Sequence, residues 1–387
     1  MSDKMNFAVI GCGMLARGQH IPNIAASPKT ALHTCCDVSE EALAICRERH
    51  HPRRITRDFR EAINDPEVQA ICLATGQTFR LPVIRAAAEA GKPVYCEKPL
   101  ANSLEEMYEI ARVVKAARIP FCVGHNRRAS PAMRQAQALF RKHMAAPAPC
   151  PWRYDREGAK RPDVAGNGVA GMSVRINDDW YSWKLHVFDP DTLRNGPMLW
   201  EMTHFTDMCN WFLASEPAEV VALDAGIFNN GVVIRYAGGE VATISMSSNG
   251  TFGYMKELYE VFGQGGAVIV DHMLEVRTAG IEGAPDKIVF PMLSDRHPGV
   301  GAELGVSGWL AKKRAACREA AQKGDTALIF TAEPDKGHAR AVDLFVDEVR
   351  GQGPVVCGVE DTIRATRICF AAIKSAQSRR AVKIEEV

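Results

Sequence analysis

The first third of the chain carries short apolar runs separated by amphipathic stretches. These runs cover residues 5–10, 31–36, 70–74, 94–96 and 121–123. Runs that are apolar at consecutive positions are typical of strands buried on both faces of a sheet. Helical patterns lie between them, and Ser103 with Glu106 forms a capping box at the start of one. This alternation predicts an α/β fold with a parallel, doubly wound sheet.

The pattern changes in the second part of the chain. Alternating or apolar runs between Gly and Asn turns cover residues 220–223, 231–236, 240–247, 256–263 and 267–270. Such runs are typical of antiparallel strands. Helical segments are expected at 197–213, 337–349 and 361–376. We therefore expect an α+β domain with a mostly antiparallel sheet.

The length of the chain favours two domains. One hydrophobic core rarely grows beyond about 250 to 300 residues, and this chain has 387. We expect a Rossmann domain over 1–127 and a second domain over 128–387, with the C-terminal helix packed back on the first. The amino-acid composition also changes at the Pro- and Ala-rich stretch 145–151.

The charge balance limits the classes of partner. Lys and Arg total 47 and Asp and Glu total 46, so no general field recruits nucleic acid or an anionic membrane. A small neutral substrate suits this balance better. The N-terminus leads directly into the run 5–10, and no apolar stretch approaches the roughly 20 residues that span a bilayer. We expect a soluble, cytoplasmic protein.

Twelve cysteines raise the question of disulfides or a metal. Five of them lie in the expected buried strands and Cys12 lies in the glycine turn, and no CxxC pair or Cys/His spacing typical of metal ligands is present. We interpret them as small, reduced core residues and expect no metal.

A glycine-rich turn follows the first apolar run. Gly11 allows a sharp turn, Gly13 allows backbone amides to approach a pyrophosphate, and Ala16 replaces the third glycine of a GxGxxG motif. Met14 and Leu15 lie at the start of the following helix, whose free N–H groups favour anions. The pattern predicts a dinucleotide-binding Rossmann unit.

Asp37, at the end of the second strand, is the acidic residue expected to bind ribose hydroxyls. A carboxylate there accepts from a 2'-hydroxyl and repels a 2'-phosphate, which favours NAD over NADP. Arg47, Arg49, Arg53 and Arg54 downstream argue for NADP, but a solvated helix end is the preferred interpretation of them.

Four blocks of the sequence form a recognisable set. They are Val-Ile-Gly-Cys-Gly at 9–13, Gly-Lys-Pro-Val-Tyr-Cys-Glu-Lys-Pro-Leu-Ala at 91–101, Gly-His-Asn-Arg-Arg at 124–128 and His-Phe-Thr-Asp at 204–207. With these blocks the sequence resembles the Gfo/Idh/MocA oxidoreductases. The second block is the most specific. The resemblance implies that the sheet of the second domain is large and open, that the substrates are pyranoses or cyclitols, and that a homodimer or homotetramer forms through the open sheet. It also implies that Lys98 and His204 flank the reacting carbon, while Glu97 contacts the nicotinamide ribose.

The expected chemistry also follows from the residue types. Oxidation of a secondary alcohol needs a group that accepts the hydroxyl proton as hydride leaves carbon. A buried Lys98 beside a positive nicotinamide ring would have a lowered pKa and could serve as that group. The alternatives are a surface lysine at a strand end and, for His204, a core histidine bonded to a backbone carbonyl.

The helix with His204 departs from the family pattern. Relatives carry an aspartate four residues before the histidine, and this chain has Trp200 there, with Glu201 one place later. On a regular helix Trp200, His204, Asp207 and Trp211 share one stripe. Glu201 either orients the imidazole or points elsewhere while Trp200 stacks on a sugar ring.

Further site candidates are weaker. Thr75, Gly76 and Asn126 are expected to line the cofactor, whereas Arg80 is expected to be a solvated helix residue. Candidates on the substrate side are His125, Trp183 and His186; the two last belong to an aromatic stretch that also fits an ordinary sheet edge. The loop 163–171 is either a lid or a linker.

These observations predict an NAD-dependent dehydrogenase acting on a secondary hydroxyl of a sugar, sugar derivative or cyclitol. Lys98 and His204 would transfer the proton and Glu201 would orient. Two rivals remain: a glycoside-cleaving enzyme that retains NAD and oxidises transiently, and a non-catalytic sensor of nucleotide and sugar.

Overall fold

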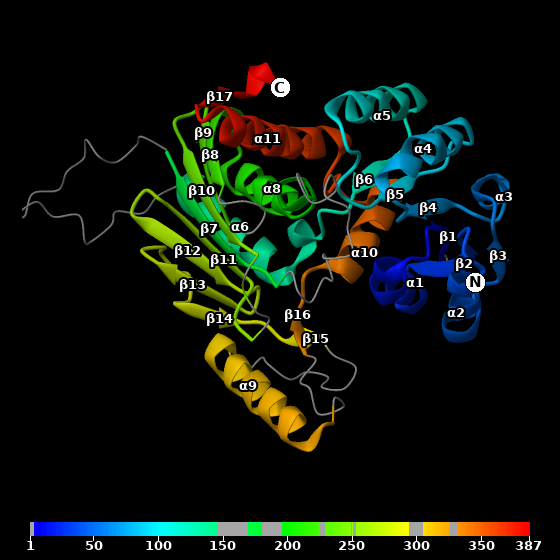
Figure 1. The fold of residues 1–387 in the computed structure, drawn as a ribbon, viewed down its shortest axis with the longest axis horizontal. Helices are drawn as coiled ribbons and strands as arrows, with labels where there is room; N and C mark the ends of the chain where they lie inside the picture. The colour runs from blue at the N-terminus through cyan, green and yellow to red at the C-terminus, as the bar shows by residue number, and fades with distance from the viewer. Residues whose placement is uncertain are drawn as a thin grey trace, which may run out of the picture. The chain divides into compact units, whose positions relative to one another are not determined.

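The computed structural model describes residues 4–145, 169–179, 196–224, 229–248, 250, 253–293, 305–325 and 332–387. The chain divides into two compact units (Figure 1). The first contains Met1–Ala129 and Gly337–Thr366, and the second contains Ser130–Lys336 and Arg367–Val387.

The first unit is built on a six-stranded sheet in which every neighbouring pair is parallel. Its order is β3-β2-β1-β4-β5-β6. The strands are β1 (Met5–Ile10), β2 (Thr30–Cys36), β3 (Arg54–Thr56), β4 (Ala70–Leu73), β5 (Val94–Cys96) and β6 (Phe121–Val123). The predicted doubly wound parallel sheet is confirmed. The order reverses between β1 and β4, and ligands of such sheets bind beyond the carboxyl ends of the strands at this point.

Helices cover both faces of this sheet. They are η1 (Ala16–His20), α1 (Ile21–Ala26), α2 (Glu40–His50), α3 (Phe59–Asn64), η2 (Gln77–Phe79), α4 (Arg80–Glu89), α5 (Leu104–Ala117), η3 (Asn126–Ala129) and α10 (His338–Val349). The apolar run in β1 follows from burial on both faces of the sheet. Phe7 and Val9 belong to one core cluster, Ala8 and Ile10 belong to the other, and all four are buried. The Ser103 side chain accepts from the amide of Glu106 at 3.2 Å and begins α5, as predicted.

Residues 337–366 belong to the first unit, although the expected boundaries assign them to the second domain. Helix α10 explains the difference. Its buried side chains, among them Phe345 and Val346, join the cluster formed by β1 and β2. The Phe345 ring packs edge-on against Phe7, with centroids 6.3 Å apart.

The second unit is built on a nine-stranded sheet of order β14-β13-β12-β11-β7-β10-β9-β8-β17. Only β7 and β10 pair in parallel, so the predicted mostly antiparallel sheet is confirmed. The strands are β7 (Gly171–Asn177), β8 (Pro217–Asp224), β9 (Asn229–Tyr236), β10 (Val241–Ser247), β11 (Glu257–Gly263), β12 (Gly266–Asp271), β13 (Glu275–Ala279), β14 (Lys287–Val289) and β17 (Val382–Lys383). A small second sheet pairs β15 (Met292–Leu293) with β16 (Glu333–Pro334).

The remaining helices are α6 (Pro131–Ala145), η6 (Pro197–Glu201), α8 (Met202–Leu213), α9 (Gly305–Lys323), η8 (Ile384–Glu386) and α11 (Val359–Ser378), which begins in the first unit and ends in the second.

The two faces of the nine-stranded sheet differ in exposure. Helices α6 and α8 cover one face, where Val232 and Ile234 of β9 are buried (Figure 1). The intervening residues of β9 are exposed, which gives the strict alternation of a strand covered on one side. No helix within the described ranges is long and apolar enough to cross a membrane.

Candidate active site

The turn after β1 depends on Gly11. Its φ is +92°, and a Cβ there would lie 2.7 Å from the carbonyl carbon of Ala74, which follows β4. Its amide donates to the Cys36 carbonyl at 2.8 Å. Any side chain would therefore separate β1 from β4, because the two backbones meet here.

Gly13 meets a different requirement. It is exposed, and a Cβ there would have no protein atom within 4 Å. The open space lies at the start of the helical segment, where Met14 and Leu15 are 75% and 45% exposed. A dinucleotide pyrophosphate, which approaches backbone amides closely, fits this arrangement.

Asp37 braces the same turn. Its half-buried carboxylate accepts the Cys12 amide at 2.6 Å and the Ser39 amide at 2.8 Å. These bonds fix the carboxylate at the carboxyl end of β2, where an acidic residue contacts ribose hydroxyls in dinucleotide-binding sheets. The structure gives the position of the Asp37 carboxylate, and its contact with a ribose stays a prediction.

The loop after β4 contains Thr75 and Gly76 and is held by Arg80. The sequence-based expectation of a solvated Arg80 is wrong: the residue is 3% exposed. Its Nε and Nη2 donate to the Thr75 carbonyl at 3.1 and 3.0 Å, and Nη1 donates to the carbonyls of Glu97 and Pro99. Arg80 therefore joins the loop after β4 to the turn after β5.

Glu97 is buried in that turn, with 4% exposure. Its Oε1 lies 2.8 Å from Nε2 of His20, and its Oε2 accepts the Lys98 amide at 3.0 Å. Burial alone would raise the pKa of Glu97, but the hydrogen bond from His20 and the nearby charges of Lys98 and Arg80 lower it to about 2. The carboxylate is thus ionised and enclosed. Sequence reasoning missed His20, although its place shortly after the glycine motif was a usable signal.

Lys98 follows Glu97 directly at the carboxyl end of β5 and is half-buried. Its neighbours in the turn are fixed by His20 and Arg80, so the backbone that carries the amine is held on both sides. This position, beyond the end of a parallel strand, is where ligands of such sheets bind.

His125 and Asn126 follow β6 and are buried, with 2% and 3% exposure. Nε2 of His125 lies 2.8 Å from the hydroxyl of Thr362. Both residues lie beyond the carboxyl end of β6, as the sequence suggested. Their predicted contacts with substrate and cofactor stay predictions.

In the second unit, His204 lies on α8 and is 5% exposed, and Asp207 on the same helix is fully buried. Trp200 and Glu201 lie just before, on the π-helical segment η6. The regular helix assumed over 197–213 is therefore wrong at its start. Hydrogen bonds in a π-helix run from i to i+5, so Trp200 and Glu201 do not keep the α-helical phase relative to His204.

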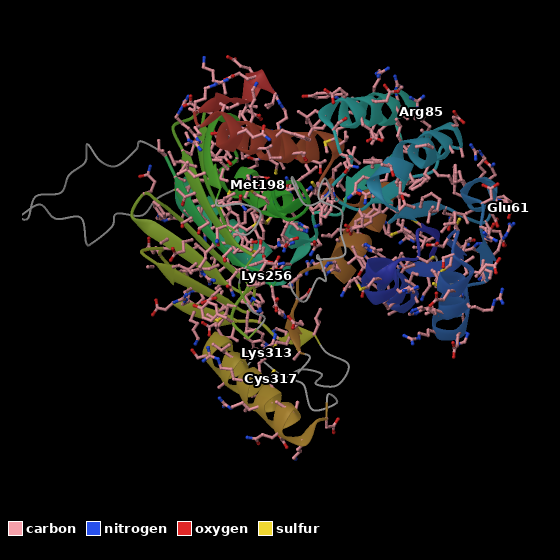
Figure 2. The ribbon with its side chains drawn as sticks, in the orientation of Figure 1. Glu61, Arg85, Met198, Lys256, Lys313 and Cys317 are labelled. Carbon is pink, nitrogen blue, oxygen red and sulfur yellow. The ribbon has the colours of Figure 1, made fainter. Side chains whose placement is uncertain are left out.

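Glu201 belongs to a buried ion cluster. Nζ of Lys256 lies 2.6 Å from Oε1 of Glu201 and 2.9 Å from Oδ2 of Asp178. The Lys256 and Asp178 side chains are 6% and 2% exposed, and Lys256 lies just before β11 (Figure 2). Sequence reasoning missed both partners because they come from distant segments. The role of Glu201 as an orienting group stays a prediction.

Trp183 and His186 lie outside the described residues, as does most of the loop 163–171.

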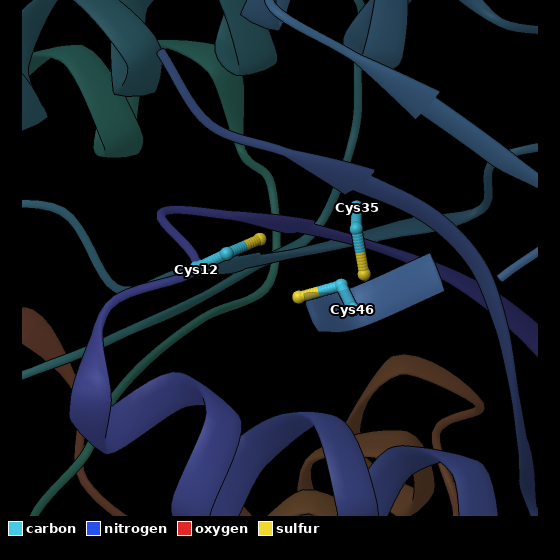
Figure 3. A group of neighbouring side chains, drawn as sticks. All are labelled: Cys12, Cys35 and Cys46. Carbon is cyan, nitrogen blue, oxygen red and sulfur yellow. The ribbon is translucent and has the colours of Figure 1, made fainter. Parts of the chain in front are cut away.

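The cysteine interpretation needs one addition. Cys12, Cys35 and Cys46 come from the glycine turn, β2 and α2, and their sulfurs lie within 4.8 Å of one another (Figure 3). All three side chains are fully buried in an apolar cluster. The pKa of the Cys12 thiol is raised by its hydrogen bond with Cys35 and by burial, and burial raises the pKa of Cys46 to about 12. The three side chains pack here among the apolar residues of this cluster.

Two family models match most of the chain. Residues 5–125 match a model described as an oxidoreductase family with an NAD-binding Rossmann fold, and 177–384 match the C-terminal alpha/beta domain of the same family. A myo-inositol 2-dehydrogenase from Thermotoga maritima is 26% identical over 99% of this chain and 99% of its own. A levoglucosan dehydrogenase from Pseudarthrobacter phenanthrenivorans is 24% identical over 70% of this chain and 74% of its own.

Solved structures share the fold. A scyllo-inositol dehydrogenase from Lactobacillus casei with bound NAD(H) and scyllo-inositol superposes with a TM-score of 0.69 at 16% identity, covering 99% of each chain. A levoglucosan dehydrogenase in complex with NADH and levoglucosan gives 0.71 at 20% identity, covering 98% of this chain and 99% of the other.

Proposed function

The chain belongs to the Gfo/Idh/MocA oxidoreductases, a family with an NAD-binding Rossmann domain, and from this premise we propose an NAD-dependent dehydrogenase of a sugar, sugar derivative or cyclitol. The named relatives support this substrate class, since they act on inositols and on levoglucosan. In this proposal the first unit binds NAD and the second supplies substrate-binding groups.

The glycine turn and Asp37 hold the dinucleotide. Amides near Gly13, Met14 and Leu15 bind the pyrophosphate, and Asp37 accepts from ribose hydroxyls. Thr75, Gly76 and Asn126 line the remainder, and Glu97 contacts the ribose on the nicotinamide side. When bound, NAD supplies the hydride acceptor.

Lys98 moves the proton. As the substrate carbon loses hydride, the hydroxyl O–H bond breaks and its proton passes to the neutral Lys98 amine. In reduction the ammonium form returns that proton to the developing alkoxide. The observation that supports this role is the fixed turn after β5, which carries Lys98 at the carboxyl end of a parallel strand, where ligands of such sheets bind.

His204 binds the substrate and takes part in proton transfer, and Glu201 orients it. The near-complete burial of His204 on α8 supports a fixed imidazole. Trp200 packs against the core and offers a ring for an apolar sugar face. His125, Trp183 and His186 complete the proposed substrate-side set.

A screen of polyols and sugars with NAD tests the function, followed by identification of the oxidised carbon. Lys98→Met is expected to lower kcat by at least about 100-fold and to leave the Kd for NAD nearly unchanged. Lys92→Met is the matched control, because Lys92 lies in the same block but bonds to the carbonyls of Asp65 and Val68. Equal turnover in the two variants would remove Lys98 from the chemistry.

The same screen separates the rivals. A dehydrogenase accumulates reduced nicotinamide in proportion to product, measured by absorbance. Product without reduced nicotinamide would indicate the glycoside-cleaving alternative. Firm NAD binding without turnover of any compound would indicate a sensor.

We also propose that the protein forms a homodimer or homotetramer through the nine-stranded sheet. Among the described residues, the face opposite α6 and α8 carries exposed apolar side chains on neighbouring strands, including Val221 at 43%, Leu223 at 71% and Val233 at 44%. They border a shallow hollow with Ser173 and Thr243. Exposed apolar patches of this kind mark association surfaces.

Light scattering after size exclusion tests this association. Leu223→Glu is expected to produce monomers by placing a charge in the interface. Val355→Glu is the control, because Val355 is 54% exposed in the first unit. A monomeric wild-type protein at micromolar concentration would contradict the proposal.

A cytoplasmic location remains part of the proposal. The described cysteines are free, and a reducing compartment keeps thiols in that state. Cell fractionation with an antibody to the protein tests it.

A further inference from the structure

The segment that follows the glycine turn and the turn that carries Lys98 meet at one buried contact. His20 ends the π-helical segment η1 and is 1% exposed. Its Nε2 lies 2.8 Å from Oε1 of Glu97, whose other oxygen accepts the Lys98 amide. A single carboxylate therefore connects the two parts of the proposed site.

The enclosure around this carboxylate leaves it little freedom. A Cβ at Gly124 would lie 2.9 Å from Oε1 of Glu97, so the chain after β6 closes one side. The Tyr95 ring packs edge-on against the His20 ring, with centroids 5.8 Å apart. Residues at the ends of β5 and β6 thus hold Glu97 against His20.

The chemistry fixes the direction of the His20 bond. An ionised carboxylate only accepts hydrogen bonds, so Nε2 of His20 carries the proton and donates. A charge-assisted bond of this kind is stronger than a neutral one, and here it is shielded from water. The π-helical geometry of 16–20 brings His20 to this position, and such segments often occur at functional sites.

We propose that His20 is a positioning residue that couples the dinucleotide turn to Lys98 through Glu97. This rests on the proposed dehydrogenase function. Binding of a pyrophosphate near Gly13 steadies the following segment, His20 steadies Glu97, and Glu97 holds the Lys98 backbone. Small misplacements of a catalytic group can cost about 100-fold in rate, so such a chain has a measurable effect.

His20→Leu tests the coupling with His20→Gln as the rescue, because the Gln amide nitrogen reaches a similar place as Nε2 and donates. We expect His20→Leu to lower kcat by about 10- to 100-fold with the NAD Kd within about threefold, and His20→Gln to recover most of the rate. His33→Leu is the matched control. His33 is a buried histidine of the same unit, and its Nε2 lies 3.2 Å from Glu67.

A double-mutant cycle shows whether His20 acts through Glu97. If it does, His20→Leu with Glu97→Gln lowers kcat no further than the worse single variant. Independent, multiplying losses would overturn the proposal. A second result would also overturn it: kcat falls in His20→Leu, His20→Gln does not restore it, and NAD binding weakens to the same extent. That pattern indicates a merely structural histidine.

A readout without substrate separates failure of this proposal from failure of the proposed function. The rate of Lys98 acetylation by acetic anhydride is measured by peptide mass spectrometry, with Lys92 as the internal reference. We expect at least about a threefold change in His20→Leu and a return in His20→Gln. An unchanged rate overturns the coupling even if the substrate screen finds no activity; a changed rate without turnover supports the coupling and counts against the dehydrogenase.

Discussion

The charged groups around Lys98 and those around Glu201, which precedes His204 by three residues, are organised in different ways. Around Lys98, the turn is held by the hydrogen bond from the Lys98 amide to the Glu97 carboxylate and by two buried side chains, His20 and Arg80. Near His204, Glu201 is tied to Lys256, which is also bound to Asp178. In the first region a carboxylate holds a backbone amide, and in the second a lysine pairs with two carboxylates. A sequence motif such as Glu97-Lys98 can therefore be recognised in the sequence, while the distant residues that hold it in place cannot.

The largest expected effect is on the cluster of the second unit. Lys256→Met removes the buried cation that contacts Asp178 and Glu201, and we expect the free energy of unfolding to fall by about 3 to 5 kcal/mol. Urea denaturation measures this. Lys323→Met is the control: its pair with Glu319 has the same 2.6 Å distance but is exposed, so its loss should stay below about 0.5 kcal/mol. Similar losses in both variants would show that burial does not matter here.

Acid should weaken the first unit through Glu97. Its pKa in the folded protein is about 2 against an ordinary 4.5, so its contribution is fully present above about pH 4.5 and is lost as the pH falls toward 2. The stability advantage of wild type over Glu97→Gln should shrink by about 3 kcal/mol across that range.

Glu386 offers a matched control for this titration. Its pKa is also about 2, because of the hydrogen bond from Arg380, but the carboxylate is exposed. The effect of Glu386→Gln should be smaller and should disappear in high salt, whereas that of Glu97→Gln should persist. Equal salt sensitivity would contradict the enclosed position of Glu97.

Gly124→Ala should disturb the Glu97 contact without changing any polar group. The new methyl would lie 2.9 Å from Oε1, and relief of that contact should cost about 1 to 3 kcal/mol. Gly18→Ala is the comparison, since no atom lies within 4 Å of a Cβ there. It should raise stability by about 0.5 to 1 kcal/mol. Thermal unfolding of both variants measures these changes in stability. A Gly124→Ala variant as stable as wild type would indicate that Glu97 is loosely held.

The smallest expected effect concerns Glu348 on α10. Burial raises its pKa to about 7, so the fold prefers the protonated form and stability falls as the pH rises from about 4.5 through 7. Glu348→Gln should therefore gain stability over wild type with rising pH, by less than about 1 kcal/mol because the group is partly solvated. The exposed Glu105→Gln is the comparison variant in the same Tm measurement. A gain in the stability of Glu348→Gln at low pH only would contradict the raised pKa of Glu348.

Local patterns predicted much of the fold. Consecutive apolar residues such as Phe7 to Ile10 indicated strands buried on both faces, and alternation indicated the half-covered sheet. Strand β3 and helix α3 were missed, because they are short and largely polar. The placement of α10 in the first unit was not expected, since no local pattern says which core an amphipathic helix joins, whereas the C-terminal helix was expected to pack on the first domain.

By itself, the sequence determined the strand and helix types, the glycine turn and the place of Lys98 at a strand end, because each depends on neighbouring residues and on backbone geometry. Only the tertiary structure decided that Arg80 is buried, that His20 meets Glu97, that Lys256 binds Glu201 and that three cysteines gather beneath the turn. These contacts join segments far apart in the chain, and they form where packing brings strand ends together. Residue type fixes what a side chain can bind, and packing fixes which partner it meets.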